Sequence, residues 1–146
     1  SDKEIPEECD IEERITAVKR RVLIMDDEEM IREIVGEMLN LIGYEFEFAS
    51  DGAEAIEIYK RAKEENRPFD AVILDLTIPG GMGGREAIEK LVSVDPGIRA
   101  IVSSGYSDDK VMSEYEKYGF KGVLSKPYTI EGLSKALQEV INGGKG

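Results

Sequence analysis

Histidine and tryptophan are absent from the 146 residues, and cysteine occurs once, as Cys9. Without histidine, the chain provides no Ser-His-Asp or Cys-His catalytic group, no histidine ligand for zinc and no phosphohistidine of its own. A single cysteine excludes an intramolecular disulfide and a cysteine-only metal site, so Cys9 is interpreted as an incidental thiol. Carboxylates, hydroxyls and lysines must therefore carry any chemistry.

Basic residues are scarce, with 19 Lys and Arg against 31 Asp and Glu and a formal net charge of −12. A surface this negative repels phosphate backbones and anionic lipids, so direct contact with nucleic acid or a membrane is not expected. No apolar run approaches the ~20 residues needed to cross a bilayer, and no basic-then-apolar signal peptide opens the sequence. We expect a cytoplasmic protein.

The composition fits one globular domain, because 41% of the residues are hydrophobic and the length is that of a single domain. Residues 1–20 are expected to form an acidic linker or N-terminal extension, in which Ile11, Ile15 and Val18 recur at helical spacing. A frayed tail is an equally good interpretation of this segment. Residues 21–142 should form the domain and 143–146 a glycine-rich tail.

Five apolar segments read as strands. Residues 22–25, 71–74 and 100–102 are apolar throughout, which is typical of strands buried on both faces. Residues 45–48 alternate polar and apolar, and the run at 123–124 is short, so these two should be the edges. Alternation with helices predicts a doubly wound α/β fold of the flavodoxin-like type. Its five-stranded parallel sheet should have the order 2-1-3-4-5, with helices on both faces.

Amphipathic helices are expected between these strands. The first should end at Gly43 and the fourth should carry Val111, Met112 and Tyr115, which are more readily explained as core residues than as a partner surface. The apolar face of the first helix is predicted to consist of Ile31, Ile34, Val35, Met38, Leu39 and Ile42.

Reactive side chains follow four of the five expected strands. Taken singly, each has an ordinary explanation; Asp27, for example, could cap the following helix. Ligands bind beyond the carboxyl ends of the strands in such sheets, however, and the joint arrival of these side chains at one edge predicts a site. They are Asp26, Asp27, Asp75, Ser103, Ser104 and Lys126.

The charges of this group indicate its chemistry. Three gathered carboxylates repel one another, so either some of them stay protonated or a cation joins them, and oxygen ligands suit Mg²⁺. Lys126 supplies a compact positive charge suited to a tetrahedral anion. If Asp75 became an acyl phosphate, that group would carry a formal charge of about −2, and Asp26 and Asp27 together would carry about −2. The +2 charge of Mg²⁺ and the +1 charge of Lys126 would offset most of this negative charge. The residues therefore favour a phosphoryl-accepting carboxylate with Asp75 as nucleophile.

This spaced set, with Gly105 after Ser104 and Pro127 after Lys126, resembles the receiver domain of two-component response regulators over residues 21–142. The segments 74–84 and 103–107 are most similar to receivers at the C-terminus of hybrid sensor histidine kinases. The resemblance implies that Asp75 is the phosphoacceptor and that Asp27 ligates Mg²⁺ directly, Asp26 mostly through water. It adds the backbone carbonyl of Thr77 as a further ligand.

The resemblance also implies that Ser104 and Lys126 contact phosphoryl oxygens and that Lys126–Pro127 is a cis peptide. Thr77 and Tyr106 occupy positions that tune hydrolysis of the acyl phosphate in the family. Two departures stand out: Val123 replaces the usual switch aromatic, and the loop after Pro79 is one residue longer than the common pattern, most simply a flexible turn.

The expected partners are a histidine kinase or a histidine phosphotransfer domain, with Tyr118 and Phe120 as the candidate partner surface. Any catalytic activity would be limited to self-phosphorylation from a phosphodonor and autodephosphorylation. Phosphodonors would be the only small-molecule substrates. A degenerate receiver acting as an adaptor stays open because of Val123. A phosphatase of the haloacid dehalogenase type is disfavoured because its Asp-x-Asp pair is missing. A nucleotide or flavin module is disfavoured because Gly80–Gly84 lack the Gly-x-Gly-x-x-Gly spacing.

Overall fold

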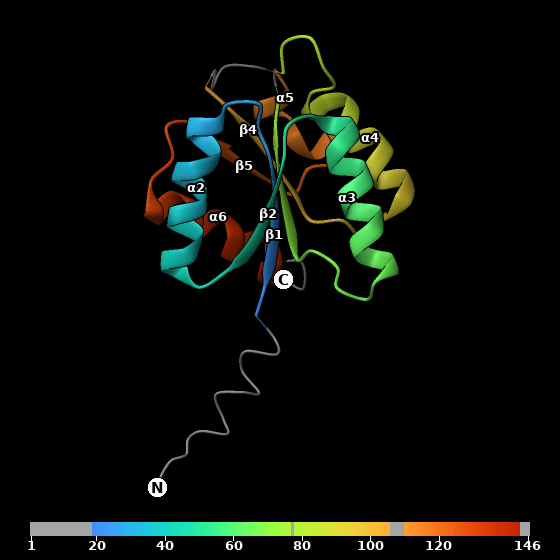
Figure 1. Ribbon diagram of the computed structural model, residues 1–146. Coiled ribbons are helices and arrows are strands. Elements are labelled where there is room, and N and C mark those ends of the chain that lie inside the picture. Colours follow the sequence, from blue (N-terminus) through green and yellow to red (C-terminus); the bar gives the residue numbers. More distant parts are fainter. Residues whose placement is uncertain (1–18, 77, 106–109, 144–146) are drawn as a thin grey trace, which may run out of the picture.

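The computed structural model describes residues 19–76, 78–105 and 110–143. Ile11, Ile15 and Val18, which recur at helical spacing in the sequence, lie outside these residues. Strands and helices alternate along the described chain (Figure 1). The strands are β1 (Arg21–Met25), β2 (Glu45–Ala49), β3 (Ala71–Asp75), β4 (Ala100–Ser104) and β5 (Gly122–Ser125). The helices are α2 (Glu29–Ile42), α3 (Gly52–Glu64), α4 (Gly84–Val94), α5 (Lys110–Ser113), the 3₁₀ helix η1 (Tyr115–Tyr118) and α6 (Ile130–Gly143).

The strands form one parallel sheet in the order β2-β1-β3-β4-β5, which confirms the predicted topology. Every residue of β3 and β4 is buried, whereas β2 and β5 are partly exposed edge strands. The apolar runs therefore lie in the middle of the sheet, where both of their faces are covered.

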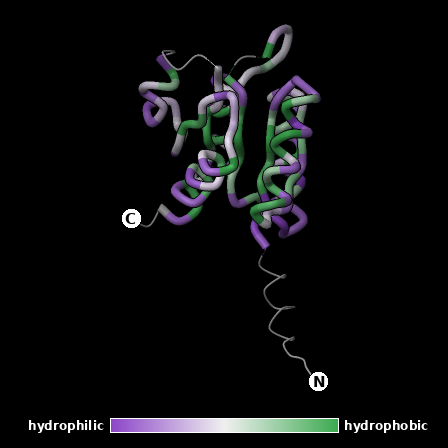
Figure 2. Tube along the Cα trace, turned by 90° about the vertical axis from the view of Figure 1, so that its left-hand side faces the viewer, coloured by the Kyte–Doolittle hydropathy of each residue, from purple (hydrophilic) through white to green (hydrophobic). Residues whose placement is uncertain are grey.

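Helices cover both faces of the sheet. In Figure 1, α2 and α6 lie on one side of the strands and α3 and α4 on the other. Two separate clusters of buried apolar side chains result, one on each face. Figure 2 shows the hydrophobic segments gathered along the strands and on the helix sides that face them. No helix in the described ranges has the length and apolar content needed to cross a membrane.

The predicted apolar face of α2 is correct except at Ile34. Val35 and Leu39 are fully buried, and Gly43 follows the last helical residue as expected. Ile34 is 42% exposed, so its assignment to the buried face is corrected. It lies one helical turn after Met30, which is 71% exposed, and both therefore lie at the exposed margin of the apolar face.

The region of the expected fourth helix holds only four α-helical residues in α5, followed by η1. Val111 and Met112 are buried, as expected for core residues. The prediction that Phe120 belongs to a partner surface is wrong, because this side chain is 1% exposed. The chain turns after η1, with the Phe120 N–H donating to the Tyr115 carbonyl, and this turn directs the ring into the core beside α4.

Candidate functional site

The carboxyl ends of the strands bring the predicted side chains together. Met25 of β1 pairs with Leu74 of β3, so the next residues lie at the same level: Asp26 directly follows β1, and Asp75 is the last residue of β3. Asp26 is 1% and Asp75 is 5% exposed. Lys126 comes directly after β5 and reaches across to this pair. The predicted convergence at one edge of the sheet is confirmed for these three residues.

Lys126 forms ion pairs with both buried carboxylates. Its Nζ lies 2.9 Å from Oδ2 of Asp26 and 3.2 Å from Oδ2 of Asp75. Burial by itself lowers the pKa of this ammonium, but its interaction with the accepting carboxylate of Asp26 and the negative charge of Asp75 outweigh burial and raise the pKa. The ammonium therefore stays charged at neutral pH and compensates the two carboxylates.

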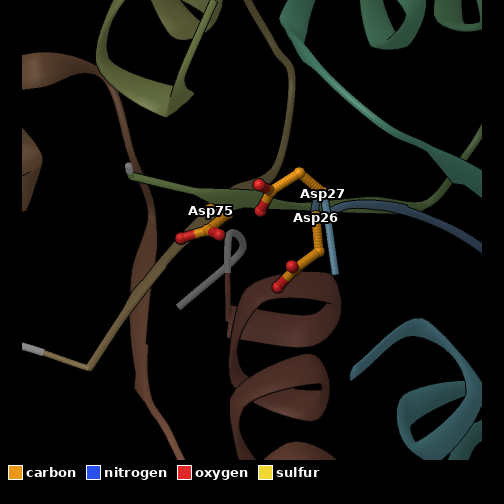
Figure 3. A group of neighbouring side chains, drawn as sticks. All are labelled: Asp26, Asp27 and Asp75. Atoms are coloured by element: carbon orange, nitrogen blue, oxygen red, sulfur yellow. The ribbon is translucent and has the colours of Figure 1, made fainter. Parts of the chain in front are cut away.

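Asp27 completes a group of three carboxylates. One carboxylate oxygen each from Asp26, Asp27 and Asp75 lies within 4.8 Å of the others, and Figure 3 shows the three side chains gathered around a common space. Asp27 is exposed, whereas the other two are buried. Several carboxylate oxygens with one side open to solvent suit Mg²⁺, which keeps part of its water shell.

Hydrogen bonds to the backbone hold Asp26 in place. Its Oδ1 accepts from the Glu28 N–H at 2.9 Å, and its carbonyl accepts from Nη1 of Arg32 at 2.6 Å. The N-cap residue of α2 is Glu28, which makes no side-chain cap. Helix capping therefore does not explain Asp27, and its carboxylate is available to the group of three.

The glycine-rich loop after Pro79 packs closely beside Asp75. A Cβ on Gly83 would lie 2.5 Å from the Leu76 carbonyl oxygen, so this position has no room for a side chain. The Gly52 N–H at the start of α3 donates to the Met82 carbonyl at 2.8 Å. The loop is therefore joined to the start of α3 by a backbone hydrogen bond.

Ser104 is the last residue of β4 and is 2% exposed. Its carbonyl accepts from the Lys126 N–H at 3.0 Å, which joins the ends of β4 and β5. The Lys126–Pro127 peptide is cis, as predicted. Thr77 and Tyr106 lie outside the described residues, and their predicted roles stay predictions.

The remaining predicted surface residue, Tyr118, is half-buried, and the guanidinium carbon of Arg85 lies 5.3 Å from its ring centroid. Two features were missed from the sequence. One is the exposed apolar stripe of α2, formed by Met30, Ile34 and Leu41; their spacing of four and seven residues was a usable signal. The other is a hydrogen bond between Ser103 and Tyr128.

Comparisons with known proteins agree with this site. Residues 22–138 match the family model described as "Response regulator receiver domain". The chain is 34% identical to the chemotaxis protein CheY of Thermotoga maritima, over 83% of this chain and 97% of that protein. It is 30% identical to sporulation initiation phosphotransferase F of Bacillus subtilis, over 85% of this chain and 95% of that protein.

Solved structures give the same result. The chemotaxis protein CheY4 of Vibrio cholerae superposes with a TM-score of 0.75 at 30% identity, covering 84% of this chain and 99% of that one. A receiver domain protein from Clostridium thermocellum has a TM-score of 0.75 at 28% identity, and the superposition covers 86% of this chain and 97% of that one. The chain therefore belongs to the response regulator receiver domain family, and its function lies in two-component signalling.

Proposed function

We propose that Asp75 accepts a phosphoryl group from a phosphohistidine on another protein or domain, and that this transfer switches the domain between two conformations. The observation that carries the proposal is the position of Lys126, whose ammonium lies 3.2 Å from Asp75 and 2.9 Å from Asp26. A structural ion pair needs one carboxylate. A lysine compensating two buried acids beside an exposed third one suits a site that receives more negative charge.

In the transfer step, an oxygen of Asp75 attacks phosphorus while the bond from phosphorus to the donor's imidazole nitrogen breaks. The nitrogen keeps the bonding electron pair, so a phosphohistidine protonated on its other nitrogen leaves as neutral imidazole. The new phosphorus–oxygen bond makes a mixed anhydride. Lys126 then pairs with a phosphoryl oxygen, and the Ser104 hydroxyl donates a hydrogen bond to another.

Asp26, Asp27 and Asp75 would hold Mg²⁺. The donor set fits this ion, because it supplies carboxylate oxygens from three residues within 4.8 Å, one of them facing solvent. When bound, the ion offsets negative charge on the phosphoryl oxygens and on the carboxylates. The Glu28 N–H donates to Oδ1 of the buried Asp26 and so orients this carboxylate toward the group of three.

The donor docks over the outer stripe of α2. Met30 lies four residues after Asp26, and Ile34 and Leu41 extend the same side of the helix away from the site. Exposed apolar residues next to a reactive centre favour a protein donor, because a small phosphodonor needs no such surface. The exposed Glu33 and Glu37 alternate with these residues and favour a donor with basic residues at the rim of the contact.

Intact mass spectrometry after incubation with acetyl phosphate and Mg²⁺ tests the proposal. The native chain should gain the mass of one phosphoryl group, EDTA should prevent the gain, and Asp75→Asn should abolish it. Asp70→Asn is the matched control, since Asp70 lies at the opposite end of β3 and should not affect the gain. A gain that persists in Asp75→Asn would identify a different acceptor. The absence of any gain in the native chain would favour an adaptor that works without phosphorylation.

A further inference from the structure

Two hydroxyl groups are paired beside the site. The Ser103 hydroxyl and the Tyr128 hydroxyl form a hydrogen bond between the end of β4 and the segment that follows β5. Ser103 is completely buried, and the ring of Tyr128 packs against the apolar cluster between the sheet and α2 and α6. The proposed phosphoryl transfer uses neither group directly.

The position of this pair relates it to Lys126. Ser103 is the register partner of Asp75 across β3 and β4, so its side chain belongs to the same face and row of the sheet. Tyr128 comes two residues after Lys126. The hydrogen bond therefore ties the backbone that carries Lys126 to the strand position directly beside Asp75.

Lys126 is held at two levels by this arrangement. On the N-terminal side of its Cα, the Lys126 backbone N–H donates to the Ser104 carbonyl at 3.0 Å. After it, the Tyr128 hydroxyl fixes the chain to Ser103. The lysine side chain has four flexible carbons, yet its ammonium must stay within contact distance of Asp26 and Asp75. Because the Lys126 backbone is held on both sides, the ammonium can reach fewer positions.

We infer that Ser103 and Tyr128 are a positioning pair, which holds the Lys126 ammonium where the phosphoryl group arrives and thereby sets the rate of phosphoryl transfer. The inference rests on the proposed function. It makes Tyr128 a positioning residue that acts through Lys126, and it distinguishes the pair from ordinary core packing.

Two properties of the pair agree with this role. Burying two hydroxyl groups costs free energy that an apolar pair of similar shape would avoid, so packing by itself does not call for them. Burial, as the main cause, raises the pKa of the Tyr128 phenol to about 12, against the opposing effects of Ser103 and Lys126. The phenol therefore keeps its proton at neutral pH, and the hydrogen bond persists over the range in which the domain would work.

The test uses Tyr128→Phe, Ser103→Ala and the double variant, each of which retains the backbone and most of the packing. The rate constant for phosphorylation of Asp75 by acetyl phosphate should fall about fivefold in each single variant, and the double variant should be no slower than either one, because the two hydroxyls act as one unit. A second readout is the ¹H–¹⁵N signal of the Lys126 ammonium, which should be resolved in the native chain and broadened in Tyr128→Phe.

Tyr59→Phe is the matched control. It also removes a phenol hydrogen bond, to Asp95 at 2.6 Å, but on the opposite face of the sheet. It should lower stability without changing the phosphorylation rate or the Lys126 signal. A rate in Tyr128→Phe within twofold of the native rate, together with an unchanged Lys126 signal, would overturn the inference. If the native chain accepts no phosphoryl group, the proposed function fails, and the ammonium signal alone then decides whether the pair holds Lys126.

Discussion

Lys126 Nζ lies 2.9 Å from Oδ2 of Asp26, and this contact joins an ammonium that is 19% exposed to a carboxylate that is 1% exposed. Removing one partner of such an ion pair lowers the stability of the fold strongly, because the remaining charge stays buried without compensation. Asp75 adds a second carboxylate that depends on the same lysine. The site thus has an excess of negative charge even before a phosphoryl group is added.

Replacing this lysine should make the fold depend on Mg²⁺. Lys126→Met is expected to lose about 3 kcal/mol of unfolding free energy in EDTA, since two buried carboxylates lose their counter-charge. Mg²⁺ should restore much of the loss, so the stabilisation by Mg²⁺ should be larger in the variant than in the native chain. Urea denaturation with EDTA and with Mg²⁺ measures both effects.

The control for this experiment is Lys90→Met, which removes an exposed lysine of α4 that forms no ion pair in the described part of the chain. Its stabilisation by Mg²⁺ should equal that of the native chain. Equal stabilisation of all three proteins would contradict the assignment of Lys126 as the counter-charge of the acidic site.

The hydrogen bond between Tyr59 and Asp95 should make stability depend on pH in a defined direction. The Tyr59 hydroxyl donates to Asp95 Oδ2 at 2.6 Å and is the main cause of a lowered Asp95 pKa, which burial opposes and Gly97 and Lys63 assist. A lowered folded-state pKa contributes stability above the unfolded value of about 3.9, and this contribution is lost as pH falls through the folded pKa.

Tyr59→Phe should therefore cost about 2 kcal/mol at neutral pH, and its difference from the native chain should shrink below about pH 4. Thermal or urea unfolding across this range gives the measurement. Tyr44→Phe is the comparison, because no hydrogen bond of its hydroxyl is found among the described residues, and its smaller effect should not vary with pH. A pH-independent loss in Tyr59→Phe would show that the bond to Asp95 carboxylate is not its cause.

The stripe on α2 should affect protein donors only. Ile34→Ser is expected to raise the half-saturating concentration of a phosphorylated histidine phosphotransfer domain about fivefold, since an apolar contact of the interface is lost. Phosphorylation by acetyl phosphate should not change, because a small donor reaches Asp75 without contacting α2. Radiolabel transfer and intact mass spectrometry measure the two reactions.

Val123→Ser provides a control at another exposed apolar position, on β5, where 37% of the residue is exposed. It should leave the half-saturating donor concentration unchanged. An equal effect of Ile34→Ser on both donors would place its defect in the acidic site, and an effect of Val123→Ser alone would move the donor surface to β5.

Much of the site followed from the order of residue types along the chain. Continuous apolar runs ending in Asp26, Asp75 and Ser104 predict central parallel strands, and parallel strands necessarily bring their carboxyl ends to one edge. The cis peptide before Pro127 was predicted through the resemblance to receivers, whose motif the chain carries after its fifth strand. These features depend on strand direction and on local motifs, which a sequence contains in full.

The rotation of each helix and the path of each turn required the tertiary structure. Phe120 and Tyr118 are both aromatic and two residues apart, yet the turn after η1 buries the first and leaves the second half-exposed. Ile34 follows the helical period of buried neighbours but lies at the margin of the apolar face, where the packing of α2 on the sheet leaves it exposed. By itself, the sequence determined which side chains reach the acidic edge. Only the packing of distant segments decided which hydroxyls and apolar groups support that edge, because contacts such as Ser103 with Tyr128 depend on distances that no local pattern encodes.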